Sequence, residues 1–235
     1  VGNLAAGVAH EIRNPLNAIS IGLQRLRKEF APSAVGARAE YDRFAEIMQA
    51  EVGRLNTIVD RFLSLARPSR LTLTEEPLAK VLEELVALFA SQASAQTVRI
   101  EADLQLGEAR VRMDRQQLTH AFMNVMLNAI QAMPGGGALR VHAAELPLDR
   151  AAISGHPSVG GRLAQITFSD SGPGIAPEDQ DRIFEPYFTT KEGGTGLGLA
   201  LTHKIVREHA GDIRVESRVG SGATFVITLP VVEER

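Results

Sequence analysis

Two stretches near the N-terminus repeat apolar residues with the period of an α-helix. In residues 1–30 the apolar positions recur at three- and four-residue steps, and 3.6 residues per turn gathers them on one stripe. Residues 44–66 show the same pattern, and Pro32 and Gly36 interrupt the chain between the two stretches. The pattern predicts two long helices in an antiparallel hairpin. The first stripe consists of Val1, Leu4, Ala5, Val8, Ile12, Leu16, Ile19, Leu23, Leu26 and Phe30.

A hairpin of two helices leaves much of both apolar stripes in water. Each large apolar side chain gains roughly 1.5–3 kcal/mol on full burial. We therefore expect a homodimer, in which a second copy of the hairpin closes a four-helix bundle. The alternative is that the stripes pack on the remainder of the same chain.

The polar face of the first helix carries a histidine. His10 lies roughly opposite the apolar stripe, in one row with Asn14, and Glu11 sits between this row and the stripe. Pro15 offers no backbone N–H to the Glu11 carbonyl, so we expect the helix to be loosened or kinked one turn after His10. On this helix alone, an ordinary surface histidine explains the pattern equally well.

Strand-like and helix-like segments mix in the second part of the chain. Residues 67–70 break the helical pattern and predict a junction between a domain of residues 1–67 and a domain of residues 68–235. The segment order predicts an α+β fold, with this second domain an α/β sandwich that has helices on one face of a mixed sheet. Residues 147–161 are expected to form a loose hairpin loop. Strands are expected at residues 71–73, 98–102, 139–144, 163–169, 213–218 and 223–229, and helices at 78–93, 115–133 and 197–210.

A polar row follows one face of the predicted helix 115–133. Asp114 is placed to cap this helix, with the Gln117 side chain reaching back. Burial of amides without partners costs a few kcal/mol, so the row should face a ligand or water. An asparagine carbonyl is also a suitable oxygen ligand for magnesium. The alternative is a solvated helix face. The row consists of His120, Asn124, Asn128 and Gln131.

Two glycine-rich turns and the segment between them complete the candidate chemistry. Residues 170–175 follow a predicted strand, and the Asp170 carboxylate can accept from an amino group such as that of adenine. Residues 193–199 run into the last helix and aim backbone N–H groups at an anion. Neither turn matches the dinucleotide fingerprint or the phosphate-loop motif. Residues 182–191 read as an aromatic-anchored lid with Lys191 at its cationic tip.

Composition narrows the function classes. The 235 residues carry 25 basic and 28 acidic side chains, so the overall charge gives no reason to expect a nucleic-acid or anionic-membrane surface. The chain has no cysteine, which excludes disulfides and thiolate catalysis and fits a reducing, cytoplasmic compartment. It opens on Val1 inside a helical pattern, so we expect a fragment whose missing upstream part would hold a sensor or an inner-membrane anchor.

In this order the segments resemble the transmitter module of sensor histidine kinases over nearly the whole chain. Residues 10–15 match the phosphoacceptor motif, residues 124–129 the asparagine motif of the ATP-binding domain, and residues 184–188 its phenylalanine motif. The glycine motifs are matched by residues 170–174, 194–199 and 220–225. The resemblance implies a dimeric phosphotransfer hairpin followed by an ATP-binding domain of the gyrase and kinase type.

The resemblance also assigns roles in the phosphotransfer hairpin. His10 would be phosphorylated by ATP and would pass the phosphoryl group to an aspartate of a response-regulator receiver domain. Glu11 would orient the ring and take its proton. Asn14 would align water for dephosphorylation of that partner.

In the ATP-binding domain, the resemblance implies that Asn128 binds Mg²⁺, Asn124 supports that site and Asp170 selects adenine. Lys191 is placed near the γ-phosphate from its charge and position alone. The other expected nucleotide contacts are Gly172, Gly174, Gly194, Thr195, Gly196, Leu197 and Gly198.

Two rival classes remain. A dimeric ATPase clamp of the gyrase and mismatch-repair type resembles this chain in its nucleotide fold, but that class has a glutamate base four residues before the metal-binding asparagine. Asn124 stands there and cannot act as a base. The second rival is a non-catalytic scaffold, which the presence of every mapped motif residue disfavours.

Overall fold

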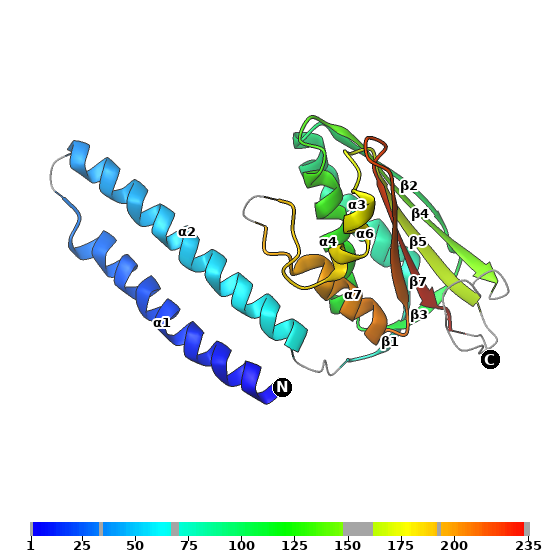
Figure 1. The fold of residues 1–235 in the computed structure, drawn as a ribbon, viewed down its shortest axis with the longest axis horizontal. Helices are drawn as coiled ribbons and strands as arrows, with labels where there is room; N and C mark the ends of the chain where they lie inside the picture. Colours follow the sequence, from blue (N-terminus) through cyan, green and yellow to red (C-terminus); the bar gives the residue numbers. More distant parts are fainter. Residues whose placement is uncertain (1, 33–34, 67–70, 148–161, 192–193, 233–235) are drawn as a thin grey trace. The chain divides into compact units, whose positions relative to one another are not determined.

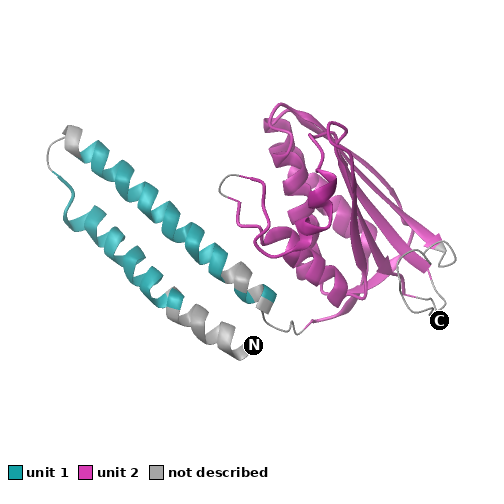
Figure 2. Ribbon diagram, viewed as in Figure 1, with its two compact units in different colours: residues 1–69 teal, residues 70–235 magenta. Residues whose placement is uncertain are grey.

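The computed structural model describes residues 2–32, 35–66, 71–147, 162–191 and 194–232. The chain divides into two compact units, residues 1–69 and residues 70–235 (Figure 2). None of the helices in these described ranges is long and apolar enough to cross a membrane.

The first unit is the predicted antiparallel hairpin. Helix α1 spans Gly2–Glu29 and helix α2 spans Val35–Ala66 (Figure 1). The break between the helices is shorter than the sequence suggested, because α2 already includes Val35 and Gly36. Helix α1 also continues through Pro15, whose missing N–H affects only one bond of the ladder.

Each apolar stripe divides into a buried half and an open half. Leu16, Leu23 and Val52 form the core between the helices, and Val59 packs against them. Within this single chain, other stripe residues stay exposed. They are Ile12, Ile19 and Leu26 on α1, Phe30 directly after α1, and Phe44, Ile47, Met48 and Leu55 on α2. One hairpin therefore buries only part of its own hydrophobic surface.

The second unit is the predicted sandwich of a mixed sheet and helices. Its main sheet has the strand order β2-β4-β5-β7-β6, in which only β2 and β4 run parallel. Helices α3, α4 and α7 cover one face of the sheet (Figure 1). The strands are β2 (Val98–Gln105), β4 (Gly137–Pro147), β5 (Arg162–Asp170), β6 (Asp212–Ser217) and β7 (Ala223–Pro230), and the helices are α3 (Leu78–Ala95), α4 (Arg115–Gln131) and α7 (Gly198–Glu208).

The core lies between α4 and the centre of the sheet. Phe122 on α4 and Phe168 on β5 are both almost fully buried, with ring centroids 5.9 Å apart. The apolar positions of α4 face this core, which fixes the rotation of the helix about its axis. Asn124, Asn128 and Gln131 of the polar row are thereby turned toward α7 and the segment before it, whereas His120 is exposed.

A small second sheet was only partly predicted. Strand β1 spans Thr74–Pro77 and pairs antiparallel with β3, Arg110–Met113, which the sequence pattern missed. The strand expected at residues 71–73 is wrong, because the partner strand pairs only with residues 74–77. The predicted loop at residues 147–161 lies almost wholly outside the described residues. The described part of the unit also contains two short helices, α6 (Pro177–Gln180) and the 3₁₀ helix η1 (Arg182–Phe184).

Candidate active site

The candidate phosphoacceptor lies in the first half of α1. His10 and Glu11 belong to the helix, but their side chains lie outside the described residues. Asn14, one turn further, is exposed. The orientation of the imidazole and the roles of these residues therefore stay predictions.

The polar row of α4 begins at a well-formed helix cap. The Asp114 Oδ1 accepts from the Gln117 backbone N–H at 3.1 Å, which confirms Asp114 as the N-cap. The reciprocal part of the prediction is wrong. The Asp114 N–H donates to His209 Nε2 at 2.9 Å, so it is not available to the Gln117 side chain.

Asn124 is a buried amide with an unsatisfied donor. Its side chain is 9% exposed, and its Nδ2 has no hydrogen-bond partner within the described part of the chain. Leaving a buried donor unpaired costs about 1–3 kcal/mol. Gly198, the first residue of α7, faces this amide: a Cβ built there would lie 3.7 Å from the Asn124 Oδ1. The orphaned donor fits a site that a polar ligand completes.

Asn128 and Gln131 converge on one cation. The Lys191 Nζ donates to the Asn128 Oδ1 and to the Gln131 Oε1, each at 3.0 Å. Burial lowers the pKa of the Lys191 ammonium, and the nearby Asp170 carboxylate acts in the opposite direction. Lys191 thus contacts the asparagine row and occupies the oxygen that was predicted from the sequence to bind magnesium, and its place near the γ-phosphate stays a prediction.

Asp170 is the last residue of β5, and only one of its two carboxylate oxygens accepts a hydrogen bond from the described residues. The Oδ1 accepts from the backbone N–H of Gly172 at 2.9 Å and of Ala223 at 3.2 Å. Burial is the main influence and raises the pKa of the Asp170 carboxyl, although these two bonds and Lys191 oppose it. Both bonds go to one oxygen, so Oδ2 is the acceptor that a ligand amino group would find.

The two glycine turns pack against protein backbone. Gly174 has φ +75°, and a Cβ there would lie 2.2 Å from the Arg218 carbonyl oxygen. Gly196 has φ +64°, and its Cβ would lie 2.3 Å from the Tyr187 carbonyl carbon. Both positions therefore require glycine for the fold of the turns themselves. At Gly196 the close neighbour is Tyr187 of the predicted lid segment. At Gly174 the close neighbour is Arg218, the residue that follows β6.

The segment between the turns is anchored by aromatic rings, as predicted. The Phe184 ring packs edge-on against Phe225 with centroids 6.5 Å apart, and lies 5.6 Å from the His203 ring. The Arg182 guanidinium stacks 4.5 Å from the centroid of the Phe188 ring. The Tyr187 N–H donates to the Gly196 carbonyl at 2.9 Å and ties this segment to the second glycine turn.

The start of α7 presents backbone N–H groups that no side chain caps within the described part of the chain. Its N-cap, Leu197, provides no side-chain hydrogen bond, and the first helical bond runs from the Leu201 N–H to the Leu197 carbonyl. Leu197 as a whole residue is fully buried, and its predicted nucleotide contact stays a prediction. Thr195 is half-buried and Gly194 exposed just before it. Unsatisfied N–H groups at a helix start favour an anion such as a phosphate.

Comparison with known proteins decides between the rival classes. Residues 113–233 match the family of histidine kinase-, DNA gyrase B- and HSP90-like ATPases, and residues 1–70 match the histidine kinase A phospho-acceptor domain. The sensor histidine kinase ZraS of Salmonella typhimurium strain LT2 is 39% identical over 232 residues, which cover 99% of this chain and 46% of ZraS. The chain belongs to the sensor histidine kinase family.

A second relative agrees with this family assignment. Sporulation kinase E of Bacillus subtilis strain 168 is 35% identical over 238 residues, which cover all of this chain and 30% of that protein. The chain thus spans less than half the length of these curated relatives.

Solved structures share the fold. Full-length ShkA in complex with AMPPNP superposes with a TM-score of 0.79 at 21% identity, covering 100% of this chain and 47% of ShkA. Histidine kinase ThkA in complex with the response regulator TrrA gives a TM-score of 0.65 at 27% identity, covering 98% of this chain and 62% of that one.

Some contacts at the candidate site could not be read from the sequence. The Ala223 N–H reaches Asp170 only because β7 pairs with β5, which brings residues 53 positions apart together. The role of His209 at the α4 cap likewise depends on how α7 packs on α4. For both, the available signal was limited to a motif at residues 220–225 and a histidine at the end of a predicted helix.

Proposed function

We propose that this chain binds ATP with Mg²⁺ in its second unit and phosphorylates His10. The observation that carries the proposal is the convergence of Asn124, Asn128 and Asp170 in that unit. They provide an orphaned buried donor, a cation-binding amide oxygen and a half-satisfied carboxylate. The phospho-acceptor family match at residues 1–70 favours a histidine kinase over a gyrase-type clamp.

The residues of the second unit fit both the adenine and the magnesium-bound phosphates of Mg·ATP. The free oxygen of Asp170 would accept the adenine amino group, and the open N–H groups at the start of α7 would receive phosphate oxygens. Within the described residues, no group of three His, Asp or Glu side chains could hold a metal alone. The Asn128 Oδ1 would therefore hold Mg²⁺ jointly with the phosphates, where the ion would neutralise developing negative charge.

Lys191 would neutralise negative charge on the phosphates at a second position. Its ammonium lies on the Asn128 Oδ1, so it must leave that oxygen before a metal can bind there. A flexible lysine with three donors can turn to a terminal phosphate without a large movement of its backbone. We assign Lys191 to the γ-phosphate on this basis.

The reaction in the first unit follows from the residue types. An unprotonated His10 ring nitrogen would form a bond to the γ-phosphorus as the bond to the bridging oxygen breaks and ADP leaves. Glu11 would take the proton from the other ring nitrogen, which keeps the product neutral at the ring. Correct alignment of the reactants would supply most of the acceleration.

The partners follow from the proposal and from the relatives. ThkA has been solved with a response regulator, and we propose that a receiver aspartate takes the phosphoryl group from His10 here too. We also propose that the chain is a homodimer through the open stripes of α1 and α2, whose exposed side chains include Ile19 and Leu26. Asn14, exposed one turn after His10, would align water for dephosphorylation of the regulator.

Labelling tests the proposal directly. Residues 1–235 incubated with γ-labelled ATP and Mg²⁺ should acquire a label that is lost in acid and stable in base, as expected for a phosphorus–nitrogen bond. The variant His10→Gln should bind ATP with unchanged affinity by calorimetry and take up no label. An acid-labile label on His10→Gln would exclude His10 as the sole acceptor.

A further inference from the structure

Asp114 joins three segments at the start of α4. Its Oδ1 caps the helix through the Gln117 N–H, and its Oδ2 accepts from the Thr72 N–H at 3.1 Å. Its own N–H donates to His209 Nε2 at 2.9 Å. One residue thus bonds to its own helix, to the chain just beyond the unit boundary, and to the end of α7.

The bond to His209 is specific to one form of the imidazole. The His209 side chain is 4% exposed, and its Nδ1 lies 2.8 Å from the Ile205 carbonyl oxygen. A carbonyl only accepts and an N–H only donates, so Nδ1 carries the hydrogen and Nε2 is the acceptor. Both ring nitrogens are therefore used, and the last turn of α7 is fixed to the cap of α4.

The two helices carry this connection to the nucleotide-binding residues. Helix α7 runs antiparallel to α4: His209 meets Asp114 at one end, and Gly198 faces Asn124 at the other. Between them the Thr202 hydroxyl donates to the Gly198 carbonyl at 3.0 Å within α7, and its oxygen lies 3.5 Å from the Ala121 carbonyl oxygen on α4. At 1.5 Å per residue, about 15 Å of helix separate the cap from Asn124.

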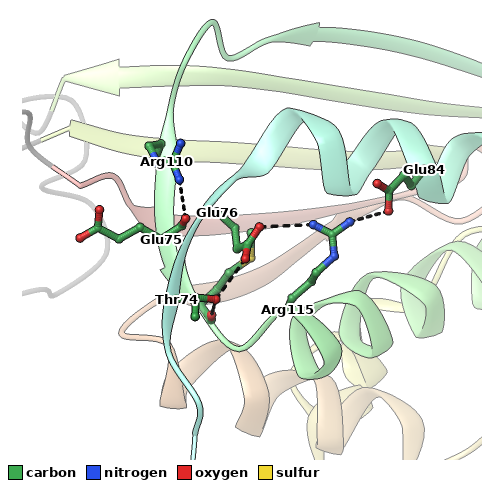
Figure 3. Close-up of polar contacts among 7 residues, drawn as sticks. Thr74, Glu75, Glu76, Glu84, Arg110 and Arg115 are labelled. Atoms are coloured by element: carbon green, nitrogen blue, oxygen red, sulfur yellow. Dashed lines mark hydrogen bonds and ion pairs between the residues drawn. The ribbon is translucent and has the colours of Figure 1, made fainter.

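The junction segment, residues 71–77, is the part of the second unit that follows the boundary between the units. Besides the Thr72 bond, it reaches α4 through Glu76, which pairs with the Arg115 guanidinium at 3.4 Å (Figure 3). The same guanidinium also bonds to Glu84 on α3, and the Arg110 side chain donates to the Glu75 carbonyl at 2.7 Å. The segment is therefore held both by its pairing with β3 and by the start of α4, which it contacts through Thr72 and Glu76.

We propose that Asp114 is a positioning residue that couples the junction segment to the two nucleotide-binding helices. The connection between the two units runs through this segment, so a displacement there would act on the cap of α4 and, through His209, on α7. Nucleotide binding at the two helices would likewise act on the junction segment, because coupling between two sites is reciprocal. The part that concerns nucleotide rests on the function proposed above, while the mechanical connection does not.

Hydrogen exchange of residues 1–235 without nucleotide tests the mechanical connection. Thr72→Pro removes the backbone donor and also fixes φ at residue 72, and Thr72→Ala is the control that keeps the donor while removing the hydroxyl. We expect Thr72→Pro to accelerate exchange roughly threefold or more both in residues 114–118 and in residues 205–211. Thr72→Ala should match the unchanged protein. Acceleration confined to residues 71–77, or equal acceleration in both variants, would overturn the proposal.

Exchange with Mg·ADP tests the reciprocal effect. In the unchanged protein, ADP should slow exchange in both helices and in residues 71–77. In Asp114→Ala, ADP should still slow exchange in the helices but no longer in residues 71–77. If Asp114 were only a structural cap, the variant would lose the slowing in both regions or keep it in both. Slowing of residues 71–77 that survives in Asp114→Ala contradicts the coupling. If the unchanged protein shows no slowing anywhere, the nucleotide assignment fails, and the Thr72 variants still decide the mechanical connection.

Discussion

The open stripe of the hairpin gives a quantitative prediction for the dimer. In a single chain Ile19 is 51% exposed and Leu26 is 45% exposed. Full burial of such a side chain is worth roughly 1.5–3 kcal/mol, so about 1 kcal/mol per side chain remains to be gained in a dimer. Two such residues in each of two copies contribute about 3–4 kcal/mol to the free energy of dimer association, and truncation to alanine removes most of this contribution.

The double variant Ile19→Ala, Leu26→Ala should therefore raise the dimer dissociation constant roughly a hundredfold. Sedimentation equilibrium at a series of concentrations measures this constant. Alanine keeps helix propensity high, so the effect of the double variant reports on the interface rather than on helix formation.

Ile21 provides the matched control. It is 58% exposed, yet at 100° per residue it lies on the opposite face of α1 from Ile19 and Leu26. Ile21→Ala should leave the dissociation constant unchanged. An equal weakening by Ile21→Ala, or a monomer at micromolar concentration for the unchanged chain, would refute the assignment of the stripe to a dimer interface.

Four further predictions concern the functional residues. Asn128→Ala should abolish the magnesium dependence of ADP affinity in calorimetry, whereas Gln131→Ala should preserve it; equal effects would contradict the metal assignment. Lys191→Met should weaken ATP roughly tenfold relative to ADP, as expected for one lost bond to a charged group; equal weakening of both nucleotides would remove Lys191 from the γ-phosphate. Asn14→Ala should keep autophosphorylation and lower dephosphorylation of the regulator about a hundredfold; equal loss of both would make Asn14 structural. The raised pKa of Asp170 means that the folded state binds the proton more tightly, so the stability of the unchanged protein relative to Asp170→Asn should fall as pH rises from the ordinary value of 3.8 to the raised one. Urea unfolding across this range measures the difference, and a flat profile would show that burial does not govern this carboxyl.

Local sequence determined the elements that depend on periodicity and capping. The two helices of the hairpin, the helices near residues 78, 115 and 197, and five strands of the main sheet follow from apolar spacing, because one buried face imposes a fixed period on each element. The Asp114 cap was also predictable from local sequence, because the first N–H groups of a helix need a nearby acceptor.

Long-range pairing decided the rest. The strand at residues 74–77 forms where β3 offers a partner, so the Leu-Thr-Leu pattern at residues 71–73 was misleading. Lys191 on Asn128, Ala223 on Asp170 and His209 on Asp114 join residues 53 to 95 positions apart. Sequence spacing identifies the side chains that carry charge or hydrogen bonds. Only the packing of α7, β7 and the segment that ends at Lys191 brings the partners within 3.2 Å of one another, because a hydrogen bond requires that distance and local propensity does not set it.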